Sequence, residues 1–148
     1  MADIRFGPIR FIPGPNRGKY PNCHTVFIDG DGILIDPAAD RGRLERLRRE
    51  ETVKEIWLSH FHEDHFMHLD LFDDLPLRMH PADAPALASM TAFLDAYGIV
   101  APDFREQFAN LVTTLFHFRD RRPRGDLYGG RTLHLSQVTV DVIHTPGH

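Results

Sequence analysis

Four side chains of the kind that bind metal ions stand within six residues of one another, and this cluster constrains the chain more than any other feature. They are His60, His62, Asp64 and His65. The preceding stretch, Ile56-Trp57-Leu58-Ser59, is mostly apolar, which predicts a buried strand that runs directly into the cluster. Imidazole and carboxylate groups that arrive together at the end of a strand are what a catalytic site for a divalent metal requires. The sequence therefore predicts a fold in which a buried strand delivers a metal-binding loop.

The spacing inside the cluster favours two neighbouring metal ions. Alternate residues of an extended segment point to the same face, so His60 and His62 can reach one ion. Asp64 and His65 come after the chain turns and are expected to reach a second, adjacent position. The order His62-Glu63-Asp64-His65 is one residue shorter than the helical His-Glu-x-x-His motif of zinc proteases, so we do not interpret it as that motif.

A second cluster, at the end of the sequence, contains the next candidate ligand. It reads His144-Thr145-Pro146-Gly147-His148 and follows a strand predicted from Val138 to Ile143. Because His148 comes after a Pro-Gly turn at the end of that strand, we expect it to be the third ligand of the first metal, whereas His144 is expected to pack the turn. Three protein ligands and a water molecule are the open arrangement of catalytic zinc, which lowers the pKa of the bound water to about 7.

The remaining pattern predicts a mixed α/β protein, and 148 residues suit a single domain, 1–148. The stretch Asp29-Gly30-Asp31-Gly32 separates two β-branched runs and indicates a hairpin. Asp40 is a suitable N-cap for a helix whose inner face carries Leu44 and Leu47. The predicted strands are Ile4 to Ile12, Thr25 to Ile28, Ile33 to Ile35, Val53 to Ser59, Leu75 to Met79, Arg131 to Leu135 and Val138 to Ile143. The predicted helices are Arg41 to Glu51, one that starts within His65 to Phe72, and most of Pro81 to Phe118.

Several residues that could carry chemistry are interpreted as structural. Apolar residues at helical spacing are expected to face the core, with an apolar wall that faces the substrate as the second alternative. They are Phe104, Phe108, Leu111, Leu115 and Phe118. Cys23 is expected to be a small core residue. His68 is expected either at the surface or as a support for the ligands, and His117 is expected at an ordinary surface or core position.

Composition argues against several classes of function. The formal net charge is −4, so the chain has no overall attraction to nucleic acid, and the basic run Arg119 to Arg124 is interpreted as a solvated loop. A single cysteine rules out an intramolecular disulfide, which fits a reducing compartment. The first residues lack the pattern of a signal peptide, and no apolar run is long enough to span a bilayer. We therefore expect a cytoplasmic protein with a small-molecule substrate, and the sequence indicates no oligomeric state.

Three motifs together resemble those of the metallo-β-lactamase-fold superfamily. The stretch His60-x-His62-x-Asp64-His65 resembles its signature, the stretch from His144 to His148 resembles its third motif, and Ile33-Leu34-Ile35-Asp36-Pro37 resembles the strand and aspartate that precede them. The resemblance covers the chain from about Asn22 to His148. It implies an α/β fold of four layers, an αββα sandwich with the metals at the strand edge.

The resemblance also implies roles for single residues. The expected ligands of the first metal are His60, His62 and His148, and those of the second metal are Asp64 and His65. Asp64 would in addition act catalytically by orienting the attacking water, and Asp36 would support the ligands from behind. The expected cofactor is Zn²⁺, as one or two ions, with iron or manganese as alternatives because the same ligands accept all three metals.

The implied activity is metal-dependent hydrolysis, in which metal-bound hydroxide attacks the carbonyl of an ester, thioester, lactone or amide. Two alternatives remain open. One is a mononuclear iron oxidoreductase that resembles the persulfide dioxygenases, in which Asp64 and His65 only support the iron ligands. The other is a non-catalytic half-domain that needs further residues or a partner chain.

The sequence departs from the family pattern after the third motif. The family normally continues to a bridging aspartate and a further histidine, and both are absent here, together with the last strands and helix of the sandwich. We therefore expect an incomplete second half. The stretch between His65 and His148 is long, and residues 81–125 are interpreted as a helical insertion that shapes the pocket.

Overall fold

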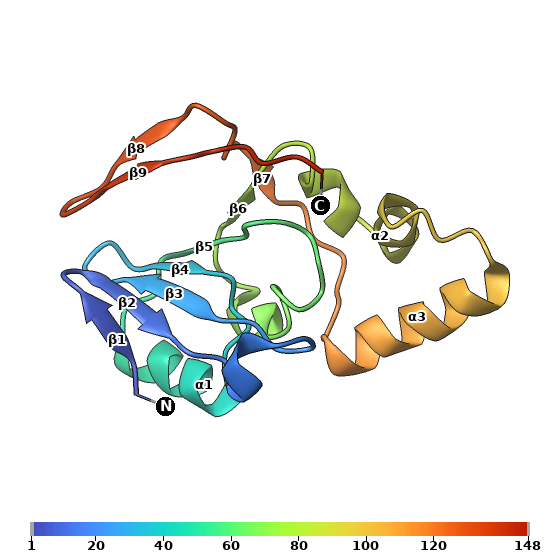
Figure 1. The fold of residues 1–148 in the computed structure, drawn as a ribbon, viewed down its shortest axis with the longest axis horizontal. Coiled ribbons are helices and arrows are strands. Elements are labelled where there is room, and N and C mark those ends of the chain that lie inside the picture. The colour runs from blue at the N-terminus through green and yellow to red at the C-terminus, as the bar shows by residue number, and fades with distance from the viewer. Residues whose placement is uncertain (1, 148) are drawn as a thin grey trace.

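A seven-stranded mixed sheet forms the centre of the computed structural model, which describes residues 2–147 (Figure 1). The strands lie side by side in the order in which they occur in the chain. The first four pair antiparallel, and the fourth to the seventh pair parallel. They are β1 (Ile4–Phe6), β2 (Ile9–Ile12), β3 (Thr25–Ile28), β4 (Ile33–Ile35), β5 (Glu55–Trp57), β6 (Leu77–Met79) and β7 (Arg124–Gly125). This sheet, with its helices, confirms the predicted mixed α/β class.

The prediction of one strand from Ile4 to Ile12 is wrong, because this segment forms the hairpin of β1 and β2. Gly7 has a φ of 58°, in the left-handed region that glycine adopts without a steric penalty. Pro8 follows it and has no backbone N–H to offer to a strand ladder. The Gly-Pro pair therefore reverses the chain at a point that the loose alternation of apolar residues did not reveal.

The hairpin predicted around residues 29–32 is confirmed, with β3 and β4 at the predicted bounds. Gly30 and Gly32 have φ values of 81° and 71°, which a turn of this kind requires and which other residues rarely adopt. Leu34 of β4 is fully buried, so the hairpin enters the centre of the core.

The first helix, α1 (Arg41–Glu50), forms as predicted. The Oδ1 atom of Asp40 accepts a hydrogen bond from the backbone N of Arg43 at 3.0 Å, which satisfies one of the free donors of the first turn. Leu44 and Leu47 are buried on the inner face of the helix. The helix lies against one face of the sheet (Figure 1), and both leucines belong to the main core.

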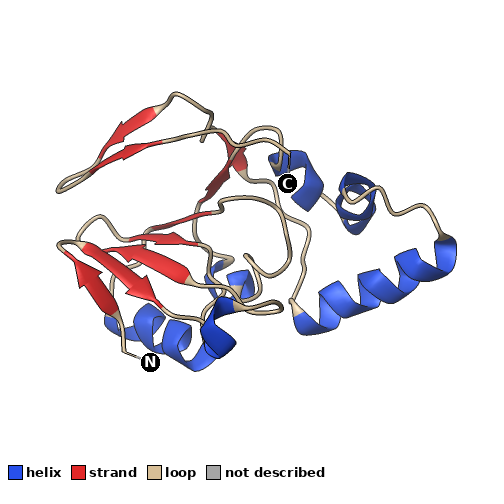
Figure 2. Ribbon diagram, in the orientation of Figure 1, coloured by secondary structure: helices blue, strands red, loops and turns tan. Residues whose placement is uncertain are grey.

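The segment from Pro81 to Phe118 is mostly helical, as predicted (Figure 2). It contains η3 (Ala84–Leu87), α2 (Met90–Ala96) and α3 (Pro102–Leu115). The predicted core face of α3 is largely wrong, because Phe104, Leu111 and Leu115 are 54%, 40% and 43% exposed. The helix lies at the periphery of the molecule (Figure 1), and only a narrow side, with Val112, Phe108 and Ala109, meets the core. The core positions predicted for Phe108 and for Phe118, which follows the helix, are therefore confirmed.

Two predicted boundaries are corrected around the metal-binding cluster. The strand predicted from Val53 to Ser59 is limited to β5, after which residues 59–65 form a loop, called the ligand loop below. No α-helix starts in the segment that follows within the described residues; it forms turns and the 3₁₀ helix η2 (Leu69–Phe72). Phe66, Leu69 and Phe72 are buried at a spacing of three, which matches the three residues per turn of a 3₁₀ helix.

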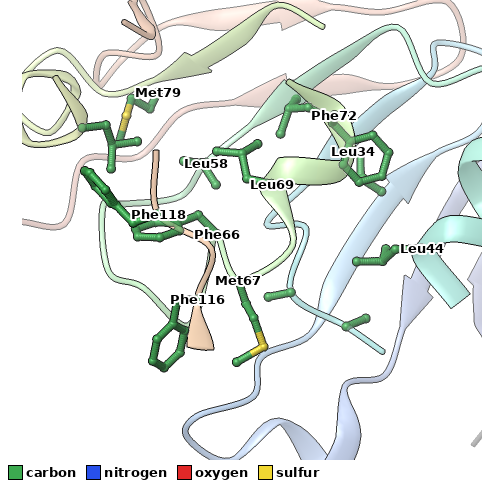
Figure 3. Packing of buried hydrophobic residues seen from close by; sticks show 14 of the residues in the cluster. Leu34, Leu44, Leu58, Phe66, Met67, Leu69, Phe72, Met79, Phe116 and Phe118 are labelled. Carbon is green, nitrogen blue, oxygen red and sulfur yellow. The ribbon is translucent and has the colours of Figure 1, made fainter. Parts of the chain in front are cut away.

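The main hydrophobic core lies between the sheet and the helices (Figure 3). Leu34 of β4 and Leu44 of α1 belong to it, as does Phe116, which follows α3. Leu58 precedes the ligand loop and Phe66 follows it, and both are at most 2% exposed. The core therefore anchors the ligand loop at both of its ends.

A second sheet covers the opposite face of the main sheet. It consists of β8 (Thr132–His134) and β9 (Thr139–Asp141), which pair antiparallel as predicted. A smaller core of Ile28, Ile33, Trp57 and Leu127 separates the two sheets. The order is helix, sheet, sheet, and Figure 1 shows no helix over the outer face of β8 and β9 among residues 2–147. Three layers of the expected four-layer sandwich are thus in place.

None of the helices within residues 2–147 is both long and apolar enough to cross a membrane.

Candidate metal centre

The candidate site lies where β4 and β5 end. These strands are parallel, with Ile35 paired to Trp57, so the residues that follow each of them meet at the same edge of the sheet. Asp36 follows β4 and has a φ of 51°, which turns its chain away from the ladder. Its backbone N donates to the carbonyl O of Trp57 at 3.0 Å. Asp36 is therefore held directly beside the start of the ligand loop.

The carboxylate of Asp36 connects three groups of the ligand loop. It accepts hydrogen bonds from the backbone N of Ser59 at 2.8 Å and from the hydroxyl of Ser59 at 2.7 Å. Its third contact is to Nδ1 of His65 at 2.9 Å. Asp36 is 9% exposed, so these contacts are shielded from water. The supporting role of Asp36 stays a prediction, and these are the contacts that such a role requires.

Three imidazole rings of the ligand loop lie close together. The ring centroid of His60 is 4.7 Å from that of His62 and 4.1 Å from that of His65. The Oδ2 atom of Asp64 lies 3.9 Å from Nε2 of His65, so these two side chains approach the same point. Their roles as ligands, and the catalytic role of Asp64, stay predictions. The expected ligand His148 lies outside the described residues.

The hydrogen-bond partners determine which nitrogen of His60 carries the proton. The hydroxyl of Ser59 donates its one hydrogen to Asp36, so at the 3.0 Å contact with Nδ1 of His60 it acts as acceptor. Nδ1 of His60 is then the protonated nitrogen, and Nε2 carries the lone pair that can bind a metal. Histidine ligands commonly hold a hydrogen bond of this kind on the other ring nitrogen.

His65 is arranged in the same way. Burial lowers its pKa, but hydrogen bonds to Asp36 and to Cys23 outweigh this effect and raise the pKa to about 10. The Sγ atom of Cys23 lies 3.6 Å from Nδ1 of His65, so Cys23 contributes to the site as well as to the core. A metal ion bound at Nε2 would replace the proton there, while Nδ1–H would keep its bond to Asp36.

The residues present fit a divalent transition metal. They offer imidazole nitrogens and a carboxylate, which are the donor types of catalytic zinc sites. The loop that carries these donors is anchored in the core. The outer contacts of Asp36 and Ser59 orient two of the rings.

Glu63, which lies inside the ligand loop but has no predicted role, is 4% exposed. Its carboxylate accepts hydrogen bonds from the hydroxyl groups of Tyr20, at 3.0 Å, and of Tyr97. Burial and the bond to Glu63 raise the pKa of Tyr20 to about 12 and also raise that of Tyr97, so both phenols remain protonated donors at neutral pH. The ring of Tyr97 stacks on His62, with centroids 5.0 Å apart. Tyr97, next to α2, therefore ties the helical segment to the ligand loop.

Replacing Tyr97 by phenylalanine is expected to destabilise the protein. The change keeps the ring on His62 but removes one of two side-chain donors to a buried carboxylate. We expect the free energy of unfolding to fall by about 1–3 kcal/mol. Urea unfolding measures this value, with Tyr128→Phe as control because Tyr128 is 53% exposed. Equal stability of the two variants would contradict the assigned contact.

A cleft of about 780 Å³ opens beside His60. Its walls include Phe61 from the ligand loop and residues 144–147 from the third motif. His144 stacks on His80, which also lines the cleft, with ring centroids 4.1 Å apart. The structure thus brings the two sequence clusters to one cleft.

Two other sequence interpretations concern ionisable side chains. His68 was expected either at the surface or as a support for the ligands. It is 8% exposed, so the first of these alternatives is wrong. In the basic run, Arg119 and Arg121 both pair with Asp73, and the side chain of Arg121 is only 11% exposed. Part of the run is therefore neutralised within the protein.

Acid is expected to destabilise the metal-free protein partly through His68. Burial, and then the charges of Arg41 and His117, lower its pKa to about 4, against the opposing charges of Asp70 and Asp40. An unfolded histidine has a pKa of about 6.5, so between about pH 6.5 and 4 the unfolded chain binds a proton that the folded chain does not. The free energy of unfolding therefore falls as the pH decreases through this range.

Urea unfolding in chelator at about pH 7 and about pH 5 measures the effect. The difference between the two pH values should be smaller in a His68→Gln variant. The same difference in both proteins would show that His68 does not contribute.

Comparison with known proteins gives the family. The model of the metallo-β-lactamase superfamily matches residues 17–148. The uncharacterized protein ML0493 of Mycobacterium leprae (strain TN) is 31% identical over 136 residues, which cover 86% of this chain and 57% of that protein. The chain thus spans little more than half the length of this relative. No solved structure gives a significant match. Because the family model covers nearly the whole chain, the chain belongs to the metallo-β-lactamase superfamily.

Proposed function

We propose that this chain carries the metal centre of a hydrolase that cleaves an ester, thioester, lactone or amide bond. One observation carries the proposal, namely the convergence of three imidazole rings and the Asp64 carboxylate on one anchored loop. The matched family supports it, since its members are typically metal-dependent hydrolases. The activity and the substrate of the whole protein are both part of the proposal.

Each residue of the site has a proposed role. His60 and His62 would hold the first metal together with His148, and Asp64 and His65 would hold the second. Zinc, when bound, lowers the pKa of its water to about 7 and polarises the substrate carbonyl. Asp36 holds Nδ1 of His65 in a hydrogen bond, so Nε2 of this ring points away from Asp36. Asp64 would orient the attacking water.

The cleft favours a substrate with an apolar acyl part. Apolar side chains line it beside His60, among them Phe61, Leu127 and Ile143. Burial of apolar substrate surface against these residues contributes binding free energy of about 25 cal/mol per Å². An ester or thioester with an apolar acyl chain therefore suits this cleft better than a highly charged substrate.

Metal analysis combined with a substrate panel tests the proposal. Protein purified without chelator is analysed by plasma mass spectrometry and assayed with an aryl ester, an acyl thioester, a lactone and an anilide. We expect bound zinc and hydrolysis of at least one compound, lost with chelator and restored by Zn²⁺. Hydrolysis that chelator leaves unchanged would contradict a metal mechanism.

Two other results point to the alternatives. Bound iron with oxygen uptake in the presence of a persulfide would indicate the oxidoreductase. Absence of tightly bound metal would indicate a non-catalytic segment that needs further residues.

A further inference from the structure

A second group of metal-binding side chains lies outside the ligand loop. It consists of His68, Asp70 in η2 and His117, which follows α3. One candidate ligand atom from each residue lies within 4.8 Å of those from the other two. Two imidazoles and one carboxylate form a donor set found in zinc and iron sites. The group joins parts of the chain about 50 residues apart, so the fold rather than local sequence assembles it.

His68 provides the strongest observation. Its ring is 8% exposed, and its Nδ1 atom has no hydrogen-bond partner among residues 2–147. A buried polar nitrogen without a partner is unfavourable, because it has lost its bond to water and gained none in return. An ion bound at this nitrogen would provide the partner that it lacks.

Asp70 is already oriented for such a role. Arg41 donates to both of its carboxylate oxygens, at 3.0 and 2.8 Å, and fixes the plane of the group. Each oxygen retains a further lone pair for a second interaction, and carboxylate ligands are commonly held by an outer partner in this way. The positive charge of Arg41 also weakens the attraction for a cation, so we expect lower affinity here than at the ligand loop.

His117 completes the set and leaves it accessible. Its Nδ1 atom donates to the carbonyl O of Met67 at 2.7 Å and is also the ring nitrogen on the side of Asp70, 3.8 Å from Oδ1. To bind an ion shared with Asp70, this nitrogen would give up its bond to Met67, and the proton of the neutral ring would then lie on Nε2. Its side chain is 35% exposed, so an ion can reach the group from solvent.

We propose that His68, Asp70 and His117 form a second site for a divalent transition metal, with zinc as the expected ion. The site is structural, because the bound ion would fix the segment that follows α3 to the segment that follows the ligand loop. It does not depend on the proposed hydrolysis, since none of its three residues belongs to the ligand loop.

Zinc titration calorimetry tests the site in a His60→Ala/His62→Ala variant, which leaves only Asp64 and His65 in the ligand loop. After chelator treatment and dialysis, this variant is expected to bind one equivalent of Zn²⁺. Adding His117→Gln should weaken binding at least about tenfold, since substitutions around a metal cost about 10–100-fold even beyond the direct ligands. Adding His134→Gln instead should leave binding unchanged, because His134 is exposed on β8.

Circular dichroism checks that each variant folds, and Co²⁺ titration gives an absorption band that reports the coordination independently. If the double variant does not fold, the same His117→Gln change in the unsubstituted protein should lower the zinc content by one equivalent. A folded double variant that binds no Zn²⁺, or equal affinities with His117→Gln and His134→Gln, would overturn the site.

Discussion

A protein in which His60 and His62 are both replaced by alanine is expected to lose metal binding at the ligand loop and, with it, hydrolysis. The change removes two of the three imidazoles that the structure brings together and leaves Asp64 and His65. Changes beyond the direct ligands already cost about 10–100-fold, so the loss of two ligands should lower activity by more than about 100-fold. Initial rates on the best substrate of the panel, together with zinc content, measure the effect.

A matched control separates this effect from a general loss of histidine. His134→Ala removes one exposed imidazole on β8 and should change neither rate nor zinc content. Near-ultraviolet circular dichroism shows whether the double variant keeps its tertiary packing. A folded double variant with unchanged rate would exclude these two histidines from the reaction.

Asp36→Asn is expected to produce the second largest effect. The amide occupies nearly the same volume but lacks the charge, and one of its ends is a donor that cannot accept from Ser59 or His65. His65 then loses its fixed orientation. We expect metal affinity and activity to fall by about 10–100-fold, which is the usual consequence of removing a partner that orients a ligand.

Asp29→Asn provides the control for Asp36→Asn. Asp29 is partly buried and pairs with Arg5 and Arg10 at the other end of the fold, so its replacement should affect stability without affecting metal affinity. Metal affinity that falls in Asp36→Asn but not in Asp29→Asn supports a positioning role. Equal affinity in the two variants at equal stability would show that Asp36 only stabilises the fold.

The local sequence predicted those elements that depend only on residues a few positions apart in the chain. The turn around Gly30 and Gly32 and the cap at Asp40 follow from backbone geometry, which neighbours in the chain decide. The burial of Leu44 follows from helical spacing in the same way. The turn at Gly7 also has a local signal, its Gly-Pro pair, but the apolar alternation around it predicts an unbroken strand.

Apolar spacing was a poorer guide where a helix lies at the edge of the molecule. Phe104 and Leu115 have the spacing of a core face, yet they are exposed because the rest of the protein reaches only one narrow side of α3. Which side of a helix is covered depends on its position relative to other elements. Spacing within the helix does not contain that information.

The sequence by itself determined the family, the order of most elements and the presence of His60, His62, Asp64 and His65 on one loop, because these depend on residue type and local spacing. Only the tertiary structure decided which distant groups surround that loop. Glu63 meets Tyr97 across 34 residues, and His117 reaches the carbonyl of Met67 across 50. Such contacts form because the core brings separate segments together, and no pattern along the chain records their distance in space.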